Sequence, residues 1–179
     1  PFFDAVVGGL SVGVPGTLDL LFTFHRDYGE LSWEEVIKPV IKLAENGFYP
    51  PKRLRNAILK EKFLLNENIN NDYFSKIKKT PLSKIKNLEY ASTLKKISAD
   101  YKIFYNGEIA SDIINKVKNH PRKPGLMELT DLSNYRSLKS KALCYKLENN
   151  TICGPNLPSS GSIAIIQALI LYEKYNFRN

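Results

Sequence analysis

The sequence has few of the residues that bind metals or build disulfide frameworks. Its 179 residues include only two cysteines and two histidines, which excludes a zinc finger of the usual kind. No phosphate-binding loop is present either, because Gly8, Gly9 and Gly13 are not followed by the Lys-Ser/Thr pair that such a loop requires. We therefore expect neither a metal nor another cofactor.

Long apolar runs are also missing. The longest run, residues 163–172, is interrupted by Gln167 and is too short to cross a bilayer, so we expect no membrane span. The whole chain is 43% apolar and 25% charged, which is the composition of an ordinary globular protein. Its length suits a single domain over residues 1–179. Neither an initiator methionine nor a signal peptide stands at Pro1, as expected of a processed piece or a truncated reading frame.

The net charge of +8 comes mostly from lysine. One interpretation is a basic face for nucleic acid or acidic lipid. The other is a biased composition, since lysine, asparagine, isoleucine and tyrosine are all plentiful and all have AT-rich codons. Arginine is scarce, and few aromatic residues suited to base stacking stand among the basic residues of 52–96. This favours the biased composition, and we expect no nucleic-acid partner.

Capping residues and apolar periodicity predict a mostly helical chain. Thr17 is placed to cap a helix over residues 18–28. Ser32, with the glutamate three residues later, forms a capping box for a second helix that ends before Gly47. Pro39 lies inside this second helix and predicts a kink or a break there.

The rest of the chain continues this pattern, with one exception near its end. Residues 66–87 are polar and rich in lysine, and we interpret them as a loop or a loosely ordered insert. Further helices are predicted over residues 54–65, 90–100, 109–118, 130–135 and 162–175.

The two cysteines flank the turn of a predicted hairpin. Its strands are residues 142–147 and 150–154, joined by a turn at residues 148–149. With the turn centred there, Cys144 lies opposite Cys153 in a closely approaching, non-hydrogen-bonded pair. Two interpretations stay open: a disulfide in an oxidising compartment, or two small apolar side chains that pack together.

No catalytic residue emerges from the pattern. His25 sits in an amphipathic helix and His120 in a proline-rich turn, and their neighbours do not indicate an activated base. Ser159, Ser160 and Gly161 precede the last helix, where exposed amides favour a polar ligand. The simpler interpretation, which we favour, is that Ser160 caps the helix and its neighbours shape the turn.

Segments along nearly the whole chain resemble, in order, the large subunit of the γ-glutamyltransferase family. The loop over residues 153–164 resembles the family's Pro-Ser-Ser-Gly-Gly loop, with Ser162 in place of the second glycine. If that glycine had a positive φ, a serine would fit it poorly. The other segments that carry the resemblance are 4–9, 11–17, 28–33, 38–48, 104–110, 125–127 and 131–135. Residues 66–87 are the stretch that lacks a clear match to the family.

The resemblance implies an α+β fold: the mostly helical part of an αββα sandwich of the N-terminal-nucleophile hydrolases, with a small β-hairpin near the C-terminus. Members are autocleaving zymogens that hydrolyse glutathione and transfer its γ-glutamyl group to amino acids or water. In the family, the nucleophile is the N-terminal threonine of the small subunit, and an arginine binds the substrate carboxylate. None of these residues maps onto residues 1–179, so we expect no catalytic residue and no activity from this chain alone.

The resemblance also implies a partner and a location. The partner is the small, catalytic subunit, from the same precursor or from a separate chain, and the complete enzyme binds glutathione or another γ-glutamyl substrate. The location is the periplasm or the cell exterior. Two alternatives stay open: a remnant or split-gene product that acts only with a separate small subunit, and a basic, non-catalytic binding module.

Overall fold

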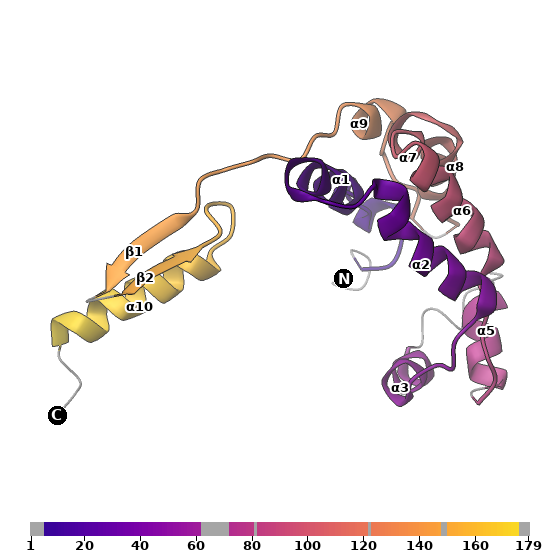
Figure 1. Cartoon of the computed structure of the whole chain (residues 1–179), viewed down its shortest axis with the longest axis horizontal. Helices are drawn as coiled ribbons and strands as arrows, with labels where there is room; N and C mark the ends of the chain where they lie inside the picture. The colour runs from indigo at the N-terminus through magenta and orange to yellow at the C-terminus, as the bar shows by residue number, and fades with distance from the viewer. Residues whose placement is uncertain (1–5, 62–71, 81, 122, 148–149, 176–179) are drawn as a thin grey trace. The chain divides into compact units, whose positions relative to one another are not determined.

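A computed structural model describes residues 6–61, 72–80, 82–121, 123–147 and 150–175. It consists of two compact units, Pro1–Ser137 and Leu138–Asn179, called here the first and the second unit. As the sequence predicts, the chain is mostly helical with a two-stranded antiparallel hairpin near its C-terminus (Figure 1).

The first unit is built from helices alone, apart from one isolated β-bridge between Phe48 and Ile85 among its described residues. In chain order the elements are the 3-10 helix η2 (Gly9–Ser11) and the α-helices α1 (Thr17–Tyr28), α2 (Trp33–Asn46), α3 (Lys52–Lys60), α5 (Asp72–Lys79), α6 (Leu88–Ala99), α7 (Ile103–Asn106), α8 (Glu108–Lys118) and α9 (Leu129–Ser133).

The start of α2 confirms the predicted capping box. The Glu35 amide donates to Ser32 Oγ over 3.2 Å, and the Ser32 amide donates to Glu35 Oε2 over 2.9 Å. The helix then passes through Pro39 without the break that this proline could have caused. It ends at Asn46, and the next residue, Gly47, has a φ of +77°, which glycine adopts easily.

The start of α1 differs from the prediction. Thr17 is the first helical residue rather than the cap, and the N-cap is Gly16. The free amide of Asp19 in the first turn is satisfied by a distant side chain instead, because it donates to the Tyr105 hydroxyl over 3.0 Å. A long-range contact has therefore replaced the local cap.

The main core of the first unit gathers around α8. On this helix, Ile114 and Val117 are buried and Ile113 packs against the same cluster. Gly9 and Gly125 cross here with their backbones in close approach: a Cβ on either would overlap atoms of the other. The buried members of the cluster are Tyr105, Ala110, Ile114, Val117, Met127 and Leu132.

A second, smaller core corrects the prediction of a loop over residues 66–87 at residues 72–79, while residues 66–71 and 81 lie outside the described residues. Residues 72–79 form helix α5, and its Ile77 is only 1% exposed. Ile77 packs with Ile58 of α3 and with Ile85, which pairs with Phe48 in the isolated bridge. Helix α3, predicted over residues 54–65, runs over Lys52–Lys60, and the last four residues of that prediction lie outside the described residues.

The second unit contains β1 (Leu143–Leu147), β2 (Asn150–Gly154) and α10 (Gly161–Tyr175). The strands pair antiparallel, with Leu147 opposite Asn150 next to the turn. Helix α10 contacts both strands and lies along the hairpin (Figure 1).

Candidate functional site

The loop that precedes α10, residues 155–160, is exposed and is held by hydrogen bonds of its own backbone. The amide of Ser159 donates to the carbonyl of Asn156 over 3.1 Å, and the Ser160 carbonyl accepts from the Ala164 amide over 3.0 Å. The Leu157–Pro158 bond is cis. Ser160 stands directly before the first residue of α10, which is the position of a helix cap. This geometry describes a tight connection between the hairpin and the helix.

The two residues after the serines differ in their surroundings. Gly161 has open space where a Cβ would stand, with only Ser159 Oγ at 4.0 Å. Ser162, by contrast, is 7% exposed, and its hydroxyl lies against Gly154 so closely that a Cβ on this glycine would overlap it. Because Ser162 has helical backbone in α10, serine is not strained there. The departure from the Pro-Ser-Ser-Gly-Gly pattern is therefore accommodated.

A disulfide between Cys144 and Cys153 joins the strands of the hairpin. The two residues are directly opposite in the register, and their Cα atoms are 4.1 Å apart. Such a short separation is typical of the non-hydrogen-bonded pairs of an antiparallel ladder. The covalent link closes the hairpin just before the serine loop, so the loop leaves from a fixed strand end.

The hairpin is tied to α10 by one strong hydrogen bond. The Tyr145 hydroxyl donates to Glu173 Oε2 over 2.6 Å. This bond to the carboxylate raises the pKa of Tyr145 above its usual value of 10.0. The contact lies near the other end of the helix from the serine loop, so α10 is attached to the hairpin along its length.

His25, one of the two histidines considered as a base, makes contacts that indicate a structural role. Its Nε2 lies 2.9 Å from the carbonyl oxygen of Leu31, and its ring stands edge-on to Trp33 at 5.4 Å between centroids. The ring therefore bridges the end of α1 and the start of α2. His120, the second histidine, is half-buried just after α8.

A buried carboxylate that sequence reasoning missed connects distant parts of the first unit. Asp19 is 4% exposed, and its Oδ2 accepts hydrogen bonds from the amide and the hydroxyl of Ser137, both over 2.7 Å. Tyr105 completes the arrangement, since its hydroxyl donates to the Pro15 carbonyl over 2.9 Å. Burial raises the pKa of Tyr105 above its usual value. The only sequence signal was an acidic residue in a first helical turn, which is common and unspecific.

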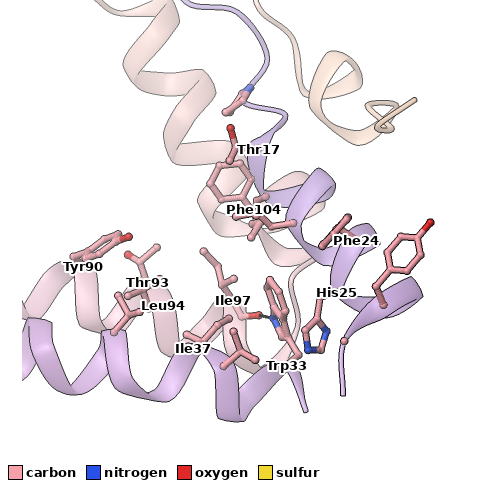
Figure 2. A pocket seen from close by; sticks show the side chains of 17 residues that line it. Thr17, Phe24, His25, Trp33, Ile37, Tyr90, Thr93, Leu94, Ile97 and Phe104 are labelled. Atoms are coloured by element: carbon pink, nitrogen blue, oxygen red, sulfur yellow. Dashed lines mark hydrogen bonds between the residues drawn. The ribbon is translucent and has the colours of Figure 1, made fainter. Parts of the chain in front are cut away.

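The first unit contains an apolar groove of about 620 Å³ between α1, α2 and α6 (Figure 2). Trp33 lies in it and donates from its indole nitrogen to the Ile97 carbonyl over 3.2 Å. Polar groups reach the groove only at a few points, among them His25 and Thr93. An apolar wall of this kind suits packing against other apolar groups better than acid–base chemistry.

The described residues place no group of three or more His, Cys, Asp or Glu side chains where they could hold a metal ion. In the same part of the chain, no helix is long and apolar enough to span a membrane. The second unit thus contains a disulfide-linked hairpin and a serine loop that is bonded to itself. The first unit contains a buried carboxylate, Asp19, that accepts two hydrogen bonds from Ser137.

Comparison with known proteins gives consistent results over almost the whole chain. The gamma-glutamyltranspeptidase family model matches residues 3–179. Glutathione hydrolase 2 of Arabidopsis thaliana is 32% identical over 177 residues, which are 94% of this chain and 29% of the relative. The glutathione hydrolase proenzyme of Pseudomonas aeruginosa is 30% identical over 171 residues, 94% of this chain and 30% of the relative.

The solved structures agree with these relatives. The gamma-glutamyltranspeptidase from Pseudomonas nitroreducens, solved in complex with L-DON, superposes with a TM-score of 0.86 at 32% identity, over 96% of this chain and 50% of that one. The chain therefore spans about 30% of the length of the curated relatives and about half of the solved chain.

Proposed function

Since the chain belongs to the gamma-glutamyltranspeptidase family, we propose that it is part of the large subunit of an enzyme that hydrolyses glutathione and transfers γ-glutamyl groups to amino acids or water. The observation that supports this most strongly is the match to the family model over residues 3–179, with similar structure throughout. The fold is that of the N-terminal-nucleophile hydrolases, of which this chain forms a mostly helical part with a small hairpin. Residues 1–179 belong, in this proposal, to one domain of the parent protein.

The role of these residues is to support the active site rather than to carry its chemistry. The family's nucleophile is the N-terminal threonine of the small subunit, and no position of this chain matches it. Ser159 and Ser160, the nearest match to a chemical motif, lie in a loop bonded to itself. This supports a connecting role for Ser159, Ser160 and Gly161. The chain by itself is then inactive.

The proposed partner is the small subunit, and helix α10 indicates why further polypeptide is needed. Its Ser162 is buried against Gly154 of β2, while Ile165, Leu171 and Tyr172 are 41–58% exposed. A helix that is apolar on all sides is normally covered on all sides. The disulfide fits a location outside the cytoplasm, because such bonds persist in oxidising compartments.

The test compares the purified chain with its parent precursor, both assayed for glutamate release from glutathione. We expect no release from the chain above a heat-killed control and clear release from a self-cleaved parent. Replacing Ser159 and Ser160 by alanine in the parent should leave its kcat and KM unchanged. Glutamate release by the chain alone would refute the division of roles, and an inactive, fully cleaved parent would refute the proposed activity.

Mass spectrometry of the source cells separates the ordinary enzyme from a split one. Peptides that continue past Asn179 to a free N-terminal threonine would identify a single self-cleaving precursor. A separate chain that begins with threonine and co-purifies with this one would identify a split enzyme. Size-exclusion chromatography adds a check on the exposed face of α10: the isolated chain should self-associate, whereas a monodisperse monomer would contradict the need for a covering subunit.

A further inference from the structure

The positive charge of this protein is concentrated in one stretch. Residues 52–86 contain ten of its 26 lysines and arginines but only three of its 18 acidic residues. The rest of the chain is nearly balanced, with sixteen basic and fifteen acidic residues. A general compositional bias would have spread the excess along the chain, so the bias alone does not explain this distribution.

The structure explains why these charges face outward. Helices α3 and α5 pack on each other through their apolar side chains, with Ile58 and Ile77 at 3% and 1% exposure. Most of the exposed side chains on these two helices are lysines or arginines, and the exposed Lys84 follows α5 in the chain. We call these basic residues the α3–α5 basic surface, defined by the exposed residues Lys52, Arg53, Lys60, Lys78, Lys79 and Lys84.

Large apolar side chains stand among these charges. Leu59, next to Lys60, is 60% exposed, and Leu82, two residues before Lys84, is 78% exposed. Lysines beside exposed leucines are the combination that binds the surface of an anionic bilayer, since the charges attract the headgroups and the leucines enter the interface.

Nucleic acid fits the same surface less well. Binding to single strands uses aromatic side chains on which bases stack, and the described aromatic residues of α5 are engaged elsewhere. Tyr73 and Phe74 contact each other edge-on at 5.4 Å and pack against the small core of Ile58 and Ile77. Lysine also outnumbers arginine on the surface, which favours diffuse attraction to phosphates over recognition of bases.

We propose that the α3–α5 basic surface docks this protein on anionic phospholipid bilayers. The lysine ammonium groups lie among the lipid phosphates, and Leu59 and Leu82 enter the headgroup region. The contact is peripheral and independent of the γ-glutamyl chemistry proposed above, so each proposal can fail without the other.

The experiment measures co-sedimentation of the 179-residue chain with vesicles of phosphatidylcholine, pure or with 30 mol% phosphatidylglycerol, an amount on the order of that in anionic membranes. The test variant is Lys78→Gln/Lys79→Gln/Lys84→Gln. Each lysine near an anionic surface strengthens binding about fivefold, so the loss of three lysines should reduce partitioning onto the anionic vesicles roughly a hundredfold. A rise in NaCl from about 50 to 500 mM should also release the wild-type chain, because salt screens exposed charges.

A matched control loses the same charge elsewhere: Lys42→Gln/Lys102→Gln/Lys116→Gln changes exposed lysines outside the surface and should bind like the wild type. A second variant, Leu59→Ser/Leu82→Ser, keeps the charge and should weaken binding about tenfold. Circular dichroism checks that all variants are folded.

Four outcomes would overturn the proposal. The first is no binding of the wild-type chain to anionic vesicles at low salt, and the second is the same loss of binding in the test and control variants. The third is binding to pure phosphatidylcholine as tight as binding to anionic vesicles, which would indicate the apolar face of α10. The fourth is tighter binding to a DNA oligonucleotide than to the anionic vesicles. The last outcome would assign the surface to nucleic acid.

Discussion

Removal of the Asp19 carboxylate should destabilise the first unit strongly. Asp19 is 4% exposed and accepts two hydrogen bonds of 2.7 Å from Ser137, which is 118 residues away in the chain. These bonds hold the end of the first unit on the first turn of α1. Asp19→Ala removes both and leaves the Ser137 amide without its acceptor.

The magnitude follows from the number and kind of bonds. A hydrogen bond to a charged group contributes about 1.5–3 kcal/mol, so two of them give about 3–6 kcal/mol. Part of this is offset, because the buried charge no longer has to be desolvated. We expect a net loss of about 3–4 kcal/mol, a large fraction of the ~5–15 kcal/mol that stabilises a typical domain.

The assay is urea unfolding followed by the fluorescence of Trp33, the single tryptophan, which lies in the same unit. Asp19→Asn keeps an acceptor of the same shape and should lose only about 1–2 kcal/mol. Thr23→Ala is the matched control. The hydroxyl oxygens of Thr23 and Ser137 are 3.5 Å apart, too far for a strong hydrogen bond, so this substitution should lower the free energy of unfolding by less than about 0.5 kcal/mol. A loss below about 1 kcal/mol in Asp19→Ala would refute the assigned role.

Three further predictions concern other parts of the fold. Gly125→Ala should lower the free energy of unfolding by about 1–3 kcal/mol in urea titrations, because its Cβ would overlap the backbone of Gly9. The Ser32 hydroxyl lowers the pKa of Glu35 below 4.5, so the capping box stabilises α2 above pH 4.5 and this contribution is lost as the pH falls through the lowered pKa. In Ser32→Ala, that pKa should return towards 4.5 in an NMR titration. Cys144→Ser should cost the second unit about 2–3 kcal/mol, measured by pulse proteolysis, because it reopens a short covalent loop.

Local patterns predicted the parts of the fold that local interactions form. Ser32 and Glu35 are three residues apart, and the capping box they predict is present. The register of the hairpin follows from its two-residue turn, which places Cys144 opposite Cys153. The choice between a disulfide and simple packing could not follow from the pattern, because both place the same two residues together.

Structure that depends on long-range contacts was predicted wrongly from the sequence or was not predicted at all. Helix α5 was predicted as loop because the lysines around Ile77 dilute its apolar pattern, and the burial of Ile77 depends on α3 and Ile85. Asp19 and Tyr105 look like ordinary residues of amphipathic helices, since their partners are far away in the chain. The same holds for the serine loop. Two serines before a helix give the same sequence pattern whether they bind a ligand or only end a loop.

The contrast between a recognisable family and the lack of a recognisable catalytic residue has a steric explanation. Several glycines of the segments that resemble the family stand where a side chain would collide with its surroundings. A Cβ on Gly16 would overlap the Tyr135 hydroxyl, and Gly9 and Gly125 would overlap each other. The close contacts at these glycines are a requirement of how the backbone packs, and not of a particular reaction. The family can therefore be identified from residues 3–179, while the chemistry belongs, in our proposal, to the threonine of the small subunit.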